Sequence, residues 1–112
     1  VVDDLAEQNL VSDERFAEAW VRVRVQKGFG PLRIRADLRQ KGISDALIVD
    51  ALAPFDEARY DQALAWARRK HRGALDEKAR ARLYRAGTNR GFSHDQVMRA
   101  IDALRREVTE GV

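Results

Sequence analysis

The chain has 112 residues, of which 45% are hydrophobic and 35% are charged, and its formal net charge is +3. It contains no cysteine, which excludes disulfides and thiolate chemistry and favours a reducing, cytoplasmic compartment. No apolar run approaches the roughly 18 residues that a membrane-spanning helix needs, so we expect no membrane partner.

Periodic apolar residues and clear helix starts predict an all-α fold. Helices are expected at 1–8, 12–27, 31–41, 44–53, 56–71, 76–88 and 93–108. N-cap residues are expected at four starts, namely Ser12, Ser44, Asp56 and Ser93. Each cap is flanked by an apolar pair typical of a hydrophobic staple: Val11 with Phe16, Ile43 with Ile48, Phe55 with Tyr60, and Phe92 with Val97. No alternating β-branched run indicates a strand.

Glycine and proline predict the turn after helix 12–27. Gly28 is expected to follow the end of this helix, and Gly30 to cap the next helix with Pro31 in its first position. Apolar faces are predicted for three sets of residues, Phe16 with Trp20 and Val23, Tyr60 with Leu64 and Ala67, and Val97 with Ile101 and Leu104. Two tryptophans, Trp20 and Trp66, are expected to pack in the core or between units.

An internal repeat organises the chain. The phrase Lys41-Gly42-Ile43-Ser44, followed by Ile48, Ala51 and Leu52, returns 49 residues later as Arg90-Gly91-Phe92-Ser93, followed by Val97, Ala100 and Ile101. The first helices of the two copies are aligned with Arg15-Phe16 over Arg59-Tyr60, Ala19 over Ala63, and Trp20 over Leu64. Such spacing is typical of stacked helical units. Residues 1–5 resemble residues 48–52, so the chain is expected to begin inside a unit.

We therefore predict a tandem array of three-helix-bundle repeats that is elongated and curved. Residues 1–11 form the third helix of an upstream, incomplete repeat. Residues 12–53 and 54–112 form two complete repeats. We expect the array to be a monomer.

Four stretches resemble the RecX family of bacterial RecA regulators. They are Asp13-Glu14-Arg15-Phe16-Ala17, Gly28-Phe29-Gly30-Pro31-x-Arg33-Ile34, Leu38-x-x-Lys41-Gly42-Ile43, and Arg90-Gly91-Phe92-Ser93. The resemblance implies a non-enzymatic protein that binds in the groove of the RecA–DNA filament. It implies that the protein limits filament growth, ATP hydrolysis and strand exchange, and so acts in homologous recombination, DNA repair and the SOS response.

One departure from the family pattern concerns a buried position. Counting back from Ile43 and Phe92 places Gly87 opposite Leu38. Glycine there removes a core side chain and costs about 1 kcal/mol of helix propensity. The middle helix of the second repeat is therefore predicted to fray at residues 87–89.

The charge is distributed unevenly, from −5 over residues 1–20 to +7 over residues 66–91. A basic face for an anionic partner is predicted at Arg22, Arg24, Lys27, Arg33, Arg35, Arg39, Arg68, Arg69, Arg72, Arg85 and Arg90. The alternative is that these residues only solvate a helical protein. A second function stays open, that of a stand-alone basic helical DNA-binding module, with weak, salt-sensitive DNA contact.

Enzyme chemistry finds little support in the sequence. His71 and His94 lie far apart, and the serines are explained by capping. The glycines near Pro31 are not followed by the Gly-Lys-Ser/Thr of a nucleotide-binding loop. Asp3-Asp4 lacks a histidine or further acid at metal-ligand spacing. We expect no catalytic residue, no cofactor and no metal.

Overall fold

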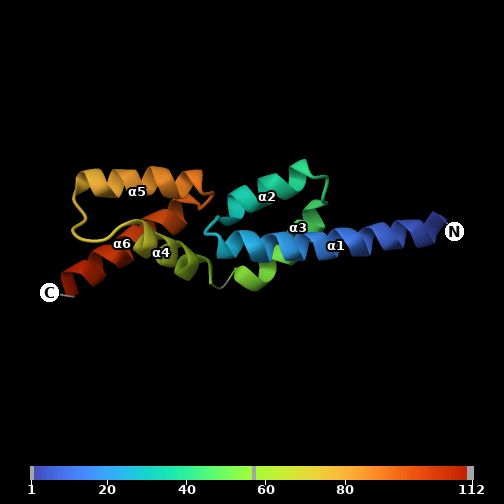
Figure 1. Cartoon of the computed structure of the whole chain (residues 1–112), viewed down its shortest axis with the longest axis horizontal. Helices are drawn as coiled ribbons and strands as arrows, with labels where there is room; N and C mark the ends of the chain where they lie inside the picture. The colour runs from blue at the N-terminus through green and yellow to red at the C-terminus, as the bar shows by residue number, and fades with distance from the viewer. Residues whose placement is uncertain (1, 57, 111–112) are drawn as a thin grey trace.

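The computed structural model describes residues 2–56 and 58–110, with side chains described for residues 11–56 and 58–109. Its helices are α1 (Val2–Gln26), α2 (Pro31–Gln40), α3 (Asp45–Leu52), the 3₁₀ helix η1 (Ala53–Phe55), α4 (Arg59–Lys70), α5 (Glu77–Asn89) and α6 (His94–Glu110). The described residues contain no strand, which confirms the all-α class. The molecule is elongated, measuring 66 × 21 × 18 Å, with α1 at one end and α4–α6 at the other (Figure 1).

Two separate hydrophobic cores divide the molecule into two three-helix units. The first core comprises Ala17, Val21, Ile34, Leu38, Ile43, Ile48, Ala51 and Leu52, from α1, α2 and α3 and the turn before α3. The second comprises Ala63, Trp66, Ala67, Leu83, Phe92, Val97, Ala100, Ile101 and Leu104, from α4, α5 and α6 and the turn before α6. Each helix packs mainly on helices of its own unit. Tandem three-helix bundles are therefore the architecture.

The repeated phrase encodes the same turn in both units. At Gly42 and Gly91 the backbone has φ of +85° and +97°, a left-handed conformation that favours glycine. The N–H of each glycine and that of the next residue donate to carbonyls three and five residues back, the Schellman pattern that ends a helix. The serine that follows then caps the next helix: Ser44 accepts from the Leu47 N–H, and Ser93 and Gln96 form a reciprocal capping box.

The predicted break between helices 1–8 and 12–27 is wrong. Helix α1 is continuous from Val2 to Gln26, so Ser12 lies inside it and caps nothing. Val11 and Phe16 are both exposed and form no staple. The physical reason is that residues 8–12 contain neither glycine nor proline, and a serine inside a helix costs only a fraction of a kcal/mol.

The predicted N-cap at Asp56 is also wrong. The chain after Leu52 continues as the 3₁₀ helix η1, and Asp56 has helical backbone angles rather than the extended ones of an N-cap. Helix α4 begins only at Arg59. Phe55 packs against the first core, whereas the hydroxyl of Tyr60 donates to Asp95 of α6, so these two residues form no staple.

Burial corrects the predicted face of α1 and the alignment of the two units. Ala17 and Val21 are fully buried, whereas Phe16 is 42% exposed and Val23 is 46% exposed. Ala19 is exposed, although its predicted counterpart Ala63 is buried. The buried pair of α1 corresponds instead to the buried pair Ala63 and Ala67 of α4. That register places Trp20 opposite Trp66.

The predicted fraying near Gly87 does not occur, because α5 continues to Asn89. Gly87 is buried, and a Cβ atom there would lie 3.2 Å from the Trp66 ring and 2.8 Å from a methyl group of Val97. The indole of Trp66 therefore occupies the space that a larger residue would need. Packing of this ring compensates for the weak helix propensity of glycine.

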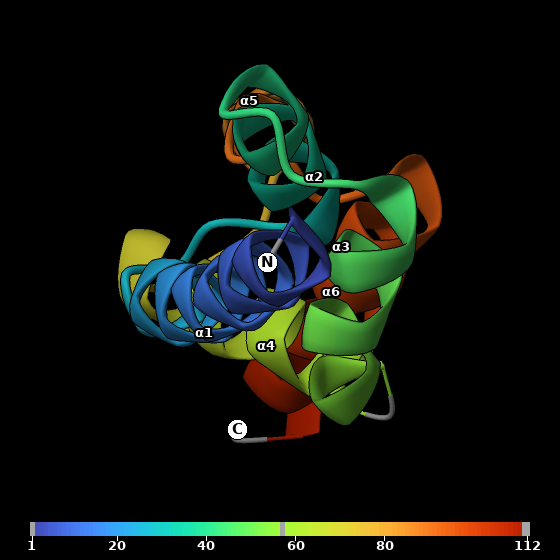
Figure 2. The same ribbon diagram turned by 90° about the vertical axis from the view of Figure 1, so that its right-hand side faces the viewer.

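The two units are joined end to end through their middle helices. The N–H groups of Gly30 and Leu32, at the start of α2, donate to the carbonyls of Arg90 and Gly91, just after α5, at 2.8 and 2.9 Å. The Arg33 guanidinium donates to the Asn89 carbonyl at 3.3 Å. Helices α5 and α2 thus follow one another along the long axis (Figure 1) and overlap when viewed along it (Figure 2). We call this contact the interunit junction.

Side chains are excluded from the interunit junction. A Cβ atom on Gly91 would overlap Arg33, and one on Gly30 would overlap the backbone of Gly91 and Phe92. A Cβ atom on Gly42 would meet nothing within 4 Å. Gly42 and Gly91 therefore share a turn but differ in what surrounds it.

This difference predicts unequal effects of the same substitution. Gly42→Ala and Gly91→Ala each place alanine in a left-handed conformation, which costs about 1–2 kcal/mol. Only Gly91→Ala also forces α2 away from α5, which we expect to add about 1–3 kcal/mol. Urea denaturation of the two variants measures the difference, and equal losses of unfolding free energy would contradict the close approach.

Candidate partner-binding surface

The residues predicted to form the basic face are all accessible to some degree. Those that are exposed are Arg22, Lys27, Arg33, Arg39, Arg68, Arg69, Arg72 and Arg85. Those that are half-buried are Arg24, Arg35 and Arg90. Accessibility alone does not distinguish a binding face from ordinary solvation, so the partners of each cation matter more.

Two of these cations are held in ion pairs within the chain. Arg39 donates to the Asp45 carboxylate at 2.8 Å. Arg68 donates to both carboxylate oxygens of Glu107 through its Nε, and its Nη2 contacts the same carboxylate. This hydrogen bonding lowers the pKa of Glu107. Both pairs are exposed, where an ion pair gains little over the solvation of its two charges, so an external anion competes with them at little cost.

A different set of cations surrounds two aromatic rings. The guanidinium carbons of Arg33 and Arg90 lie 4.9 and 4.7 Å from the centre of the Phe29 ring. Arg24 lies 5.4 Å from Phe29 and 4.3 Å from Trp20. Lys41 completes the group, with its Nζ 4.6 Å from the Trp20 ring. We call this set the cation–aromatic cluster, and its members are Trp20, Arg24, Phe29, Arg33, Lys41 and Arg90.

Local structure explains why these side chains meet. The turn at Gly28 ends α1 and places Phe29 between the last turn of α1 and the start of α2. The interunit junction brings Arg90 from the second unit to the same ring. Arg69 of α4 also approaches, since a Cβ atom on Gly28 would lie 3.3 Å from its guanidinium. The cluster is therefore a property of the assembled pair of units.

The cations of the cluster have no carboxylate partner among the described side chains. The ion pairs there are Arg39 with Asp45, Arg68 with Glu107, and Arg99 with Asp95. Beside the cluster, a hollow of about 430 Å³ is lined by Trp20, Arg24, Arg33, Asp37, Gln40 and Lys41. Asp37 supplies the single carboxylate in this lining, against three cations. The hollow is thus suited to an anionic group.

The structure brings together only part of the predicted basic face. Arg24, Arg33, Arg69 and Arg90 gather near Phe29, whereas Arg39 and Arg68 lie in ion pairs. Lys41 and the two aromatic rings were missed by sequence reasoning, because their meeting depends on the turn at Gly28 and on the packing of α2. That Arg22, Lys27, Arg35, Arg72 and Arg85 belong to the same binding face stays a prediction.

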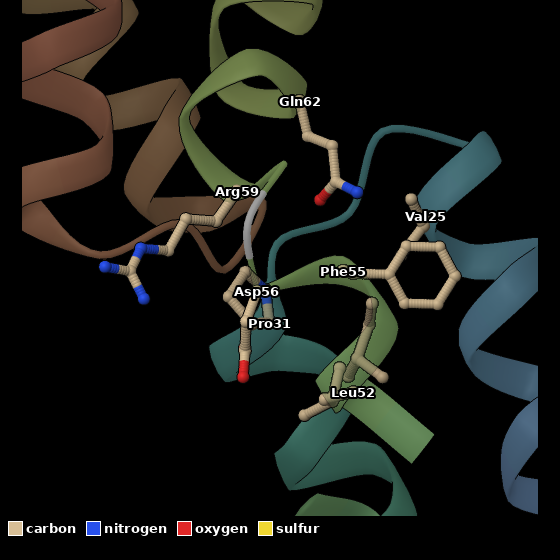
Figure 3. Close-up of a pocket in the computed structure, with 8 residues that line it drawn as sticks. Val25, Pro31, Leu52, Phe55, Asp56, Arg59 and Gln62 are labelled. Atoms are coloured by element: carbon tan, nitrogen blue, oxygen red, sulfur yellow. The ribbon is translucent and has the colours of Figure 1, made fainter. Parts of the chain in front are cut away.

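A second hollow lies between the two units but is small. Its wall is formed by Val25, Pro31, Ile34, Leu52, Phe55, Asp56, Arg59 and Gln62, and Figure 3 shows Phe55 extending toward Val25. Its cavity volume is about 30 Å³, far below the several hundred Å³ typical of small-molecule sites. This hollow is too small to hold a cofactor.

The histidines interact with groups close to them in the sequence. His71 Nε2 lies 3.0 Å from the Ala74 carbonyl oxygen, and His94 Nδ1 lies 2.9 Å from the Tyr84 hydroxyl. Among the described residues, no three metal-ligating side chains are grouped to hold an ion. Within the same part of the chain, the helices are too short or too polar to span a membrane. These observations supply no constellation on which to build a catalytic mechanism.

An ordered polar contact ties α4 to α6 near their starts. The Tyr60 hydroxyl donates to Asp95 at 2.6 Å, and the guanidinium carbons of Arg59 and Arg99 lie 5.0 and 4.3 Å from the centre of the Tyr60 ring. The hydrogen bond from Tyr60 lowers the pKa of Asp95, and the positive charges of Arg99 and Arg59 lower it further. This contact fixes the second unit rather than forming a binding site.

Comparison with known proteins decides the family. Residues 12–52 match the second three-helix domain of RecX, and residues 56–101 match the third. The chain belongs to the RecX family. Regulatory protein RecX of Halorhodospira halophila is 36% identical over 113 residues, covering 99% of this chain and 70% of the relative. The same-named protein of Chromohalobacter salexigens is 38% identical, covering 90% of this chain and 67% of the relative.

A third relative extends the comparison to another genus. Regulatory protein RecX of Vibrio parahaemolyticus is 36% identical over 97 residues, covering 85% of this chain and 63% of the relative. The chain thus spans about two thirds of the length of these RecX relatives. All three are named as regulatory proteins, and the resemblance inferred from the four sequence stretches is confirmed.

The Tyr60 contact predicts a change in the pKa of Asp95, and through it in stability at acid pH. Because the pKa of Asp95 is lower in the folded protein than its ordinary value of 3.8, its contribution to stability is present above that value and is lost as pH falls through the folded-state pKa. Tyr60→Phe removes the hydrogen bond, so we expect the Asp95 pKa to rise toward 3.8. Carboxyl ¹³C NMR titration measures it. Tyr84→Phe is the control, and an unchanged Asp95 pKa in Tyr60→Phe would contradict the assignment.

Proposed function

We propose that this chain is a non-enzymatic regulator that docks along a RecA recombinase filament and limits filament growth, ATP hydrolysis and strand exchange. The match of both three-helix units to the RecX family carries this proposal. A RecA partner implies that the chain acts in the cytoplasm. Within this proposal, residues 12–53 and 54–112 act as two complete repeats, and residues 1–11 belong to an upstream repeat.

The shape of the molecule supports docking along a filament. An array 66 Å long and about 20 Å wide spans a greater length of a groove than a compact domain of equal size. Contacts made by separate units reinforce each other, because binding of one unit raises the effective concentration of the next. Binding of this kind needs several modest contacts and an intact junction between the units.

A stand-alone DNA-binding module is the second candidate. The observation that favours it is that the cations near Phe29 have no carboxylate partner among the described side chains. Two features weaken it. The faces of Phe29 and Trp20 lie against cations, so these rings are poorly placed to stack on bases. The first N–H groups of α2, which would suit a phosphate, already donate to the carbonyls of the second unit.

Binding and inhibition measurements test the proposal together. We expect this chain to bind a RecA–DNA filament more tightly than naked single-stranded or double-stranded DNA at the same salt concentration. Charge reversal at Arg35 and Arg39, or at Arg68 and Arg72, should weaken inhibition of the RecA ATPase several-fold. Combining both reversals should weaken it further, because the contacts are linked.

The controls separate loss of docking from loss of fold. Circular dichroism should show the same helical signal in all variants, since these four arginines lie outside both cores. Arg105→Glu with Arg106→Glu applies an equal charge change to the exposed surface of α6 and should inhibit as the parent does. If the folded variant that combines both pairs of charge reversals inhibits as strongly as the parent, the docking surface does not include these arginines.

A further inference from the structure

One exposed stripe on α1 is not explained by the packing of the units. Phe16 and Val23 are 42% and 46% exposed, and Trp20 lies between them on the same helical face. The Phe16 and Trp20 rings are stacked, with centroids 5.7 Å apart. The inner face of α1 is formed by Ala17 and Val21, and Trp20 is half-buried against the first core, so Phe16 and Val23 are the members of the stripe that face solvent.

The stripe is continuous with the cation–aromatic cluster. Trp20 belongs to both, because its ring stacks with Phe16 and also lies beneath the cations of Arg24 and Lys41. Apolar side chains therefore lie next to cations that have no carboxylate partner among the described side chains, at the place where α1 meets α2. An exposed apolar patch rimmed by charge is typical of a protein interaction site.

We propose that the Phe16–Trp20–Val23 stripe and the cation–aromatic cluster form one docking surface for a protein segment that carries both carboxylates and apolar side chains. The proposal goes beyond the regulatory function above, because it names the chemistry of the contact and does not depend on which protein supplies the segment. Carboxylates would pair with the guanidinium edges, and apolar side chains would cover the stripe.

Charge and geometry favour a protein segment over nucleic acid. The guanidinium groups of Arg24, Arg33 and Arg90 lie near aromatic rings, and the planar fork of a guanidinium matches the planar carboxylate of a protein side chain. Val23 is aliphatic and offers nothing to a phosphate or a base. Asp37, in the lining of the hollow, can accept a hydrogen bond from a peptide N–H, a donor that a phosphate backbone lacks.

The surface needs both units to be in place. Arg90 comes from the end of α5, whereas Phe29 and Arg33 come from the first unit. The hydrogen bond between the Arg33 guanidinium and the Asn89 carbonyl spans the same contact. The docking surface is therefore preorganised by the interunit junction, which lowers the ordering cost of binding.

Selection from a random library of 12-residue peptides tests the proposed chemistry. The full chain is the bait, and the Lys41→Glu variant is used for counter-selection. We expect the selected peptides to be enriched in Asp and Glu together with Leu, Ile or Phe. Enrichment in acidic residues alone, or no enrichment, would overturn the proposal.

Affinity measurements then separate the two parts of the surface. Fluorescence anisotropy of a selected, labelled peptide should show about tenfold weaker binding to Val23→Ser and to Lys41→Glu. Both residues are exposed, so these variants should keep the parent's circular dichroism. Arg24→Gln removes a second cation of the cation–aromatic cluster and should also weaken peptide binding. Arg105→Glu is the matched charge control and should bind as the parent does.

Nucleic acid is the competing occupant. Binding of a labelled single-stranded oligo(dT) to the same variants is measured by fluorescence anisotropy. If the oligonucleotide binds more tightly than the peptide, and Lys41→Glu abolishes its binding while Val23→Ser does not, the surface is a phosphate site and the proposal fails. If Arg105→Glu weakened peptide binding as much as Lys41→Glu does, the binding would reflect diffuse electrostatics, and the proposal would also be overturned. Neither result bears on whether the chain inhibits RecA.

Discussion

The close approach of Gly30 and Gly91 is the contact on which the rest of the structure depends. It lets the first N–H groups of α2 donate to the carbonyls of Arg90 and Gly91, just after α5, so each helix end satisfies groups that the other leaves unpaired. The helix dipoles of α5 and α2 run in the same direction across this contact, which adds a favourable interaction. Because the two cores are separate, this backbone contact helps to hold the units end to end, together with the approach of Trp66 and Arg69 to Gly28.

The repeated phrase has two physical tasks, and the two copies show them separately. Its glycine ends a helix in a left-handed turn, and its serine starts the next helix, in both copies. Only the turn of the second copy packs against the start of another helix, α2. A Cβ atom on Gly91 would overlap Arg33, whereas one on Gly42 would meet nothing within 4 Å. The same four-residue phrase thus serves both as a turn within a unit and as a connection between units.

Sequence reasoning predicted what depends on local backbone chemistry. The turns at Gly28, Gly42 and Gly91 and the caps at Ser44 and Ser93 all lie where expected, since each needs only its own neighbours. The break at Ser12 and the cap at Asp56 were wrong because a capping residue is also tolerated inside a helix or in a 3₁₀ turn. Nothing local distinguishes these outcomes.

The candidate site was less predictable than the fold. Two apolar stripes run along α1, and periodicity favours burial of the one with the aromatic rings, Phe16, Trp20 and Val23. In the structure Ala17 and Val21 are the fully buried residues of α1. Gly87 illustrates the same limit, since only the fold shows that Trp66 fills the space beside it. Arginines could be found by composition, but their gathering around Phe29 depends on the second unit.

The partners of the cations indicate how binding energy would be distributed along the molecule. At Arg39 and Arg68 a partner's carboxylate must displace Asp45 or Glu107, so the exchange gains little net free energy. At Arg24, Arg33, Lys41 and Arg90 no described carboxylate has to be displaced, and Arg24 and Arg90 are in addition half-buried. A new charge pair there therefore gains more. Under the proposed docking, the cations where the two units meet, Arg24, Arg33 and Arg90, would therefore contribute more to binding than Arg39 and Arg68.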